Sequence, residues 1–278
     1  MNTKRKHILT LAFTLLFVSW IFMYSKPVSA AVRNCKHGDT ININLGDTVV
    51  VSQKGISEKV LKSSYTWIKF TAKDNGILHV SAKDYCADIR LTNSKKTPIS
   101  GKDESIISDP DFLAFEMDKI DYGLKKGETY YLRLEGDPDQ KNNYTMNLKF
   151  TSQKITGGAK KAKAKIIKKK KWMKGLITIG KKNTRWYKFK LPKKQRAKIF
   201  INAYGNKHIF FYMWTKKGGG VTRMIYRDNG SQAGNNKNAV NNGTKIIRSP
   251  KLPKGTVIYI KVYTRDPMSS GRYEIKWK

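Results

Sequence analysis

Apolar and polar residues alternate at every position in several short segments of this chain. The clearest are 144–150 (YTMNLKF) and 273–278 (YEIKWK), and Ile41, Ile43 and Leu45 give a further run of period two. This period places one side of a strand against a core and the other side in water. Glycine-containing turn signals separate the runs at 74–76, 218–220 and 228–230. The pattern predicts an all-β protein made of two tandem antiparallel β-sandwiches of roughly 100 to 120 residues each.

The two sandwiches are predicted to be copies of one design, because the second half of the chain repeats patterns of the first. Three pairs of segments carry the match, namely 67–70 with 186–189, 89–96 with 210–217, and 124–134 with 252–262. The predicted organisation is a signal peptide at 1–30, a first sandwich at 32–151, a lysine-rich linker at 152–171 and a second sandwich at 172–278.

The N-terminus has the three parts of a secretory signal. A basic KRK at 4–6 precedes an apolar run at 8–23, and Pro27 precedes the small-residue site 28–30, with cleavage expected after Ala30. A retained membrane anchor is the alternative, since about 17 apolar residues is the lower limit for crossing a bilayer. The helix-breaking proline favours cleavage, so we expect a secreted, extracellular protein associated with the cell surface.

Two cysteines, Cys35 and Cys86, are present in the 278-residue chain. An exported protein meets an oxidising compartment, where an even count favours one disulfide between them. Two separate buried thiols that only pack are the other interpretation.

Charge divides the chain unevenly. Residues 32–152 contain 18 basic and 17 acidic groups, whereas residues 153–278 contain 34 basic and 3 acidic groups, and the whole chain has a net charge of +36. The nearly balanced charge of residues 32–152 argues against a generally lysine-rich composition as the cause of the positive charge of residues 153–278. The asymmetry indicates an anionic partner for the second half.

The segment 152–171 holds nine lysines and Gly157-Gly158, which predicts an extended linker whose last part can form a strand around Ile166 and Ile167. An uncompensated cluster costs folding free energy, and a polyanion relieves the repulsion and releases its own counterions. Simple solubility is the other interpretation. The predicted anion-binding residues are Lys168, Lys169, Lys170, Lys171, Lys174, Lys181, Lys182, Arg185, Lys193, Lys194, Arg196 and Lys198.

Lysine predominates over arginine, which fits attraction between point charges better than bidentate recognition of bases or phosphates. We therefore expect an anionic polysaccharide, a teichoic acid or an anionic membrane surface as partner, ahead of nucleic acid. Aromatic residues among the cations can stack on sugars or bases. They are Trp172, Trp186, Tyr187, Tyr212 and Trp214; alternation places Tyr187 and Phe189 inward, and Trp186 and Lys188 outward.

An acidic stretch leaves three interpretations open: a calcium site, docking against the cationic second sandwich, or a solvated loop. Its carboxylates are Asp103, Glu104, Asp109, Asp111, Glu116, Asp118 and Asp121. No EF-hand spacing accompanies them, so we predict no metal or other cofactor.

Catalytic signatures are missing from the sequence. Residues 230–234 (GSQAG) put the serine in the wrong position for a nucleophile elbow, and no HExxH motif occurs. Cys35 and His37 have no evident third group to orient a thiol and a base. We expect a protein without enzymatic activity.

Several strands together resemble a known family. An aromatic-x-Lys-Phe strand, a glycine-containing turn, an x-Ile-x-Leu strand, Gly-x-x-Tyr-Tyr-Leu-x-Leu and a final Tyr-x-Met-x-Leu strand resemble the bacterial pre-peptidase C-terminal domain, over 62–150 and, less closely, 180–278. The resemblance implies a jelly-roll-like sandwich, usually an accessory module beside a secreted peptidase or other hydrolase. Some relatives bind calcium through acidic loop residues, but the second copy keeps only Asp228, Asp266 and Glu274.

Together these patterns predict a secreted, non-catalytic protein whose basic second sandwich attaches to an anionic polymer of the cell envelope or a host surface. The alternative is an accessory subunit that assists a separate secreted hydrolase, because no catalytic domain accompanies the two copies.

Overall fold

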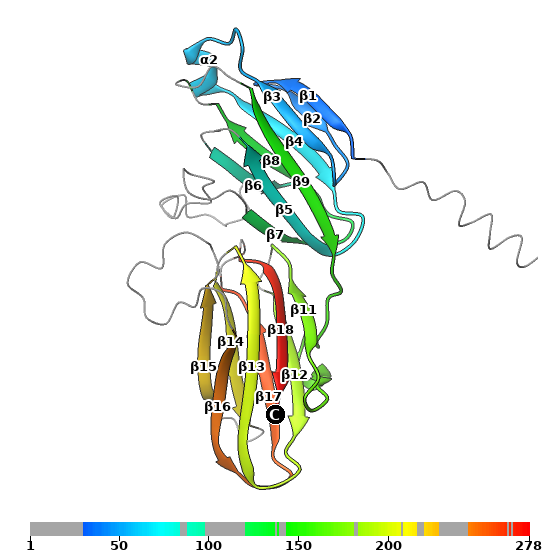
Figure 1. Cartoon of the computed structure of the whole chain (residues 1–278), viewed down its shortest axis with the longest axis vertical. Coiled ribbons are helices and arrows are strands. Elements are labelled where there is room, and N and C mark those ends of the chain that lie inside the picture. The colour runs from blue at the N-terminus through cyan, green and yellow to red at the C-terminus, as the bar shows by residue number, and fades with distance from the viewer. Residues whose placement is uncertain are drawn as a thin grey trace, which may run out of the picture. The chain divides into compact units, whose positions relative to one another are not determined.

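A computed structural model shows two β-sandwiches that follow one another along the chain (Figure 1). Residues 32–278 form one compact unit. The structure describes residues 30–83, 88–97, 120–136, 138, 143–180, 183–206, 208–215, 220–227, 244–265, 267 and 269–278. The predicted all-β class and the two tandem sandwiches are confirmed; the predicted signal peptide, up to residue 29, lies outside the described residues.

The first sandwich consists of two sheets and one short helix, α2 (Glu58–Ser63). Its strands are β1 (Val32–Lys36), β2 (Thr40–Asn42), β3 (Thr48–Ser52), β4 (Tyr65–Thr71), β5 (Gly76–Lys83), β6 (Asp88–Asn93), β7 (Ile120–Leu124), β8 (Thr129–Glu135) and β9 (Tyr144–Ser152). One sheet has the order β1-β3-β9-β5-β7, and the other has the order β2-β4-β8-β6.

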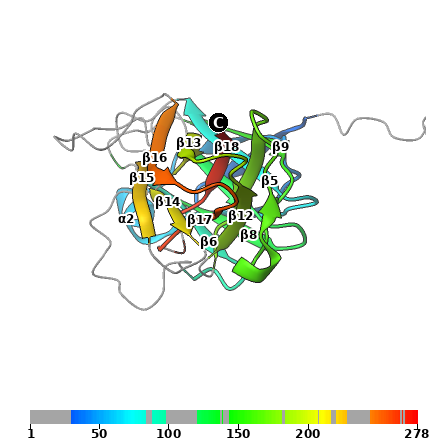
Figure 2. The ribbon, with the colours of Figure 1, turned by 90° about the horizontal axis from the view of Figure 1, so that it is seen from below.

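The second sandwich repeats this arrangement with a short 3₁₀ turn, η2 (Lys161–Lys163), near its start. Its strands are β10 (Lys165–Ile166), β11 (Met173–Ile177), β12 (Thr184–Lys190), β13 (Gln195–Gly205), β14 (His208–Thr215), β15 (Gly220–Arg227), β16 (Lys245–Leu252), β17 (Val257–Tyr263) and β18 (Gly271–Trp277). The two sheets have the orders β10-β12-β17-β14-β15 and β11-β18-β13-β16. Figure 2 shows them as two layers.

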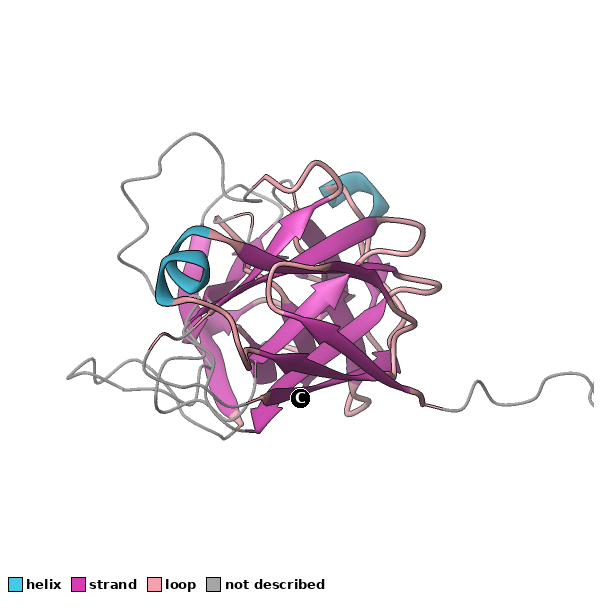
Figure 3. Cartoon of the chain, turned by 90° about the horizontal axis from the view of Figure 1, so that it is seen from above, coloured by secondary structure: helices cyan, strands magenta, loops and turns pink. Residues whose placement is uncertain are grey.

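Each core is built by the predicted alternation. In β9, Tyr144, Met146 and Leu148 are buried while the residues between them face outward. In β18, Tyr273, Ile275 and Trp277 are buried in the same way. Strands therefore predominate (Figure 3), and none of the described helices is long and apolar enough to span a membrane.

Three edge pairs depart from the antiparallel prediction. The pairs β1 with β3, β2 with β4, and β10 with β12 run parallel. Successive strands at the start of each sandwich belong to alternate sheets, so the chain comes back to a sheet in its original direction. Parallel pairing needs a crossover of this kind, whereas a hairpin gives antiparallel neighbours.

The internal repeat has the same position in both sandwiches, since β4 and β12 each pair with the strand that carries the Gly-x-x-Tyr or Gly-x-x-Ile motif. One predicted match is displaced by a residue. Ile89 lies opposite Leu134, and Phe211 lies opposite the equivalent Val262, so Ile89 corresponds to Phe211 and not to Phe210. A one-residue slip moves every side chain to the other face of a sheet.

The lysine-rich segment predicted as a linker is packed on the second sandwich. Gly158 forms a β-bridge with Trp186, and β10 pairs with β12. Ile167 is only 2% exposed, and Trp277 Nε1 donates a hydrogen bond of 2.9 Å to the Ile167 carbonyl. The second sandwich thus begins near Gly158 and not at Trp172.

Candidate anion-binding face

The outer side of the β11-β18-β13-β16 sheet collects cations from four strands. On β13 and β18, buried residues alternate with outward ones, and β16 adds two exposed cations at one edge. We call the outward cations the cationic face: Lys174, Arg196, Lys198, Arg248, Lys251, Arg272, Lys276 and Lys278. The four strands contain one carboxylate, Glu274.

Cross-strand register places like charges directly opposite one another on this face. Lys198 lies opposite Arg248, and Arg196 lies opposite Lys251. On its other side, Lys198 exchanges two backbone hydrogen bonds with Lys278, of 3.0 and 3.3 Å. Arg248, Lys198 and Lys278 therefore form one row across three neighbouring strands. Like charges opposite each other destabilise a sheet, so a bound anion lowers the free energy of this arrangement.

Aromatic rings hold several of these cations in place. Lys276 Nζ lies 4.1 Å from the centroid of Trp172 and 5.3 Å from that of Phe200. Lys278 Nζ lies 4.9 Å from the Phe200 centroid. A cation over an aromatic face is attracted by the ring quadrupole without losing its charge. The ammonium groups of Lys276 and Lys278 therefore lose part of their conformational freedom before an anion arrives.

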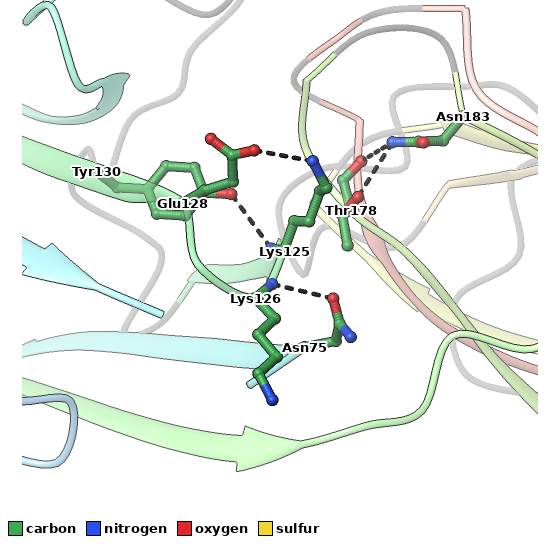
Figure 4. A network of polar contacts seen from close by, with 7 residues as sticks. All are labelled: Asn75, Lys125, Lys126, Glu128, Tyr130, Thr178 and Asn183. Carbon is green, nitrogen blue, oxygen red and sulfur yellow. Dashed lines mark hydrogen bonds and ion pairs between the residues drawn. The ribbon is translucent and has the colours of Figure 1, made fainter. Parts of the chain in front are cut away.

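Among the described residues, carboxylates form ion pairs with several cations of the first sandwich but with one cation of the second. Lys125 Nζ lies 2.8 Å from Glu128 Oε1 in the turn between β7 and β8 (Figure 4), and Arg33 Nε lies 3.2 Å from Asp47 Oδ2. Among the described residues of the cationic face, Lys174 alone has an ion pair, at 3.6 Å from Glu274. Seven of the eight cations thus keep their charge available to an external anion.

The predicted anion-binding residues divide into five groups, of which Arg185 alone forms the last. Lys174, Arg196 and Lys198 belong to the cationic face. The exposed turn 168–171 borders it, because the Lys170 amide donates to the Trp277 carbonyl. Lys193 and Lys194 are exposed in the turn before β13, whereas Lys181 and Lys182 lie outside the described residues.

Arg185 points toward the core side of β12 and is only partly exposed. Its guanidinium donates to the Thr184 carbonyl at 3.3 Å and offsets part of the rise that burial causes in the pKa of Tyr187 and of Tyr273. Those two phenols are hydrogen-bonded to each other at 2.7 Å. Arg185 therefore lies on the core side of β12 and does not belong to the cationic face. Tyr187 and Phe189 are buried, which agrees with their predicted inward positions. Trp186 and Lys188 are partly exposed, which agrees with their predicted outward positions.

Sequence reasoning missed five members of the face: Arg248, Lys251, Arg272, Lys276 and Lys278. The alternation in β18 carries the signal for two of them, since Arg272 and Lys276 occupy the outward positions between buried neighbours. Their proximity to Lys198 depends on sheet order, which a sequence pattern does not supply.

Cys35 and His37 do not form a thiol and base pair. Burial and the Asp39 carboxylate raise the pKa of Cys35 to about 11, which suppresses the thiolate at neutral pH. His37 is buried, with Nε2 3.1 Å from the Ser64 carbonyl and Nδ1 3.4 Å from Thr66 Oγ1. Cys86 lies outside the described residues, so the disulfide stays a prediction.

The stability of the first sandwich is expected to fall on mild acidification because of His37. Burial lowers its pKa below the usual 6.5, so the unfolded chain takes up a proton at a higher pH than the folded chain does. Stability is full above the unfolded value and decreases as the pH falls through it. Urea denaturation between about pH 7 and pH 5 should show this decrease, and His37→Gln should weaken it. An unchanged pH dependence in that variant would contradict the assignment.

A row of three polar side chains in the first sandwich crosses β7, β5 and β9. Asp121 Oδ1 lies 2.6 Å from His79 Nδ1, and His79 Nε2 lies 3.2 Å from Thr151 Oγ1. The order of groups is that of a catalytic triad, but all three project from neighbouring ladder strands whose amides pair with each other. An oxyanion hole needs free backbone donors beside the nucleophile. This row is a cross-strand contact that ties three strands together.

The acidic stretch falls mainly on residues outside the described part, where Asp103, Glu104, Asp109, Asp111, Glu116 and Asp118 lie. Asp121 is described and contacts His79. No group of three or more metal-ligating residues occurs among the residues that the structure describes.

Comparison with known proteins finds distant structural similarity and assigns neither a family nor a function. No protein-family model matches the chain, and no curated protein matches it. The CUB1-EGF-CUB2 domains of rat MASP-1 are similar, with a TM-score of 0.21, 7% identity, and coverage of 85% of this chain and 99% of that chain. The CUB1-EGF-CUB2 domain of human MASP-1/3 gives a TM-score of 0.20 at 7% identity, covering 83% and 99%. Function is therefore inferred from the chain's own residues, and the pre-peptidase resemblance stays a prediction.

Proposed function

We propose that this is a secreted, non-catalytic binding protein whose second sandwich attaches through the cationic face to an anionic polymer of the cell envelope or a host surface. The observation that carries the proposal is the row Arg248, Lys198 and Lys278, in which cations face each other across three strands. Ladder geometry fixes their spacing, so a polymer with repeated negative charges can contact several of them at once.

The type of cation supports a polymer without a specific sequence. Five of the eight cations are lysines, which are point charges on flexible stems and do not require a planar bidentate acceptor. Multiple weak contacts along one chain add up when the geometry allows them to form together.

Binding of the full chain to polyphosphate is expected to depend steeply on salt. A protein that neutralises about six to ten phosphates loses roughly 10³- to 10⁵-fold in affinity between about 50 and 200 mM salt. Titrations followed by fluorescence anisotropy of labelled polyphosphate at rising sodium chloride would measure the slope, with uncharged dextran as the control polymer. Absence of binding at low salt, or an affinity that does not change with salt, would contradict the proposal.

A further inference from the structure

The other outer surface of the second sandwich, on the β10-β12-β17-β14-β15 sheet, carries a group of aromatic side chains. Trp186 and Trp214 have ring centroids 6.5 Å apart, and Tyr212 lies 6.2 Å from Trp214 and 5.7 Å from Tyr263. These rings point away from the core and keep part of their surface exposed. Packing of the sandwich interior therefore does not account for them.

Lysines are interleaved with these rings in a regular way. Trp186 on β12 lies opposite Lys261 on β17, and in the next row on the same face Lys188 on β12 lies opposite Tyr259 on β17. The aromatic ring is thus on β12 in one row and on β17 in the other, with a lysine opposite it each time. Lys261 Nζ is 4.3 Å from the Tyr263 centroid, and Lys161 Nζ, from η2, is 4.8 Å from the Tyr259 centroid. Each ring on this surface thus has a cation beside it.

The first sandwich repeats the same pattern on the equivalent sheet. Trp67 lies opposite Arg133, and Lys69 lies opposite Tyr131. Lys96, from the turn after β6, lies 4.9 Å from the Trp67 centroid and 5.4 Å from the Tyr131 centroid. This surface is cationic although the first sandwich as a whole is close to neutral. We call the two surfaces the aromatic–cation faces.

On the described part of the aromatic–cation face of the second sandwich, one hydrogen-bond donor lacks an acceptor. Trp214 Nε1 is buried and has no hydrogen-bond partner among the described residues. A buried donor left without an acceptor costs free energy, so this position of Trp214 is not explained by hydrogen bonding inside the sandwich.

We propose that the two aromatic–cation faces bind an acidic polysaccharide whose carboxylates are attached directly to its sugar rings. The C–H groups on the flat side of a sugar have partial positive charge and pack against the negative face of an indole or phenol ring. Side chains directly opposite each other on neighbouring strands are about 4.5–5.5 Å apart at Cβ, so a ring-bound carboxylate reaches the adjacent cation. This inference rests on the proposed function and names the class of polymer.

Two other classes of polymer fit these faces less well. Polyphosphate and polyglycerol phosphate have charge but no ring to stack. In a nucleic acid, a sugar separates the phosphate from the base, so stacking on the aromatic ring leaves the charge away from the neighbouring lysine. Recognition of single strands uses aromatic stacking and a separate basic groove.

A pair of double variants of the full chain tests the proposal. Trp67→Leu with Trp186→Leu removes a ring from each face, whereas Trp67→Phe with Trp186→Phe keeps a smaller ring in each place. We expect the leucine pair to weaken binding to polygalacturonate by about tenfold or more, which is the size of the loss when an aromatic side chain that stacks on a nucleic-acid base is removed. The phenylalanine pair should weaken binding less, because a ring remains in each place. Binding to polyphosphate should change little in both pairs.

Shielding of tryptophan from acrylamide gives a second measurement that does not require the variants to be fully stable. Polygalacturonate should protect the fluorescence of the wild-type chain from quenching, and the protection should decrease in the phenylalanine pair. Equal losses for polygalacturonate and polyphosphate, unchanged shielding, or tighter and ring-dependent binding of oligothymidylate would overturn the polysaccharide assignment alone. Failure of the wild-type chain to bind any polyanion at low salt would overturn the proposed function with it.

Discussion

Replacing Lys198, Arg248 and Lys276 together with glutamine is expected to weaken binding to polyphosphate by about 100-fold at moderate salt. Each cation that neutralises a phosphate contributes roughly 0.7 to 0.9 to the slope of log affinity against log salt, so three losses lower the slope by about two to three. The three residues sit at the centre of the cationic face, on β13, β16 and β18. Titration at several salt concentrations measures both quantities.

The first sandwich offers a matched control with the same change in net charge. Lys54, Lys73 and Lys126 are exposed lysines outside the cationic face. Their joint replacement with glutamine should leave the affinity within about threefold of the wild type, because surface charges act mainly on nearby ligands at physiological salt. Equal losses in the two triple variants would show that net charge, and not the face, determines binding.

The second large effect concerns folding. Ile167→Ala is expected to destabilise the second sandwich by about 2–5 kcal/mol, since it removes a buried side chain from a packed core. Ile167 packs in the cluster that contains Tyr187, Phe189 and Trp277. If residues 152–171 formed an extended linker, Ile167→Ala would not lower the free energy of unfolding by this amount.

The adjacent residue is the control. Ile166 is 65% exposed, and Ile166→Ala should change the free energy of unfolding by no more than about 0.5 kcal/mol. Both variants have the same composition and differ only in position. Urea denaturation of the full chain, followed by tryptophan fluorescence, compares them, and similar values for the two would contradict the packed placement of this segment.

Alternation was sufficient to predict the sandwiches, because burial of one side of a strand imposes a period of two whatever the other strands do. It also oriented Trp186 and Tyr187 correctly from their positions alone. The lysine-rich segment was predicted only in part. The apolar pair Ile166 and Ile167 indicates a strand, as observed in β10, whereas the repulsion among nine lysines indicates an extended linker. Burial of Ile167 in the core packs the segment against the second sandwich instead.

Proximity between distant segments could not be predicted. Lys198 and Arg248 are 50 positions apart in the sequence and directly opposite in the sheet. Which strands become neighbours depends on the chain path between the two layers, and a hydrophobic pattern does not contain that path. Lys168 to Lys171, which are consecutive in the sequence, therefore only border the cationic face. The order of the strands brings together the residues at its centre, such as Lys198 and Arg248.

Acetylation of lysines, read by mass spectrometry with and without polyphosphate, tests the central claim most directly. Bound polymer should protect Lys198, Lys276 and Lys278 from the reagent while Lys54 and Lys73 react at the same rate as in the free chain. Protection spread evenly over both sandwiches, or confined to lysines outside the cationic face, would contradict a localised site for anionic polymers.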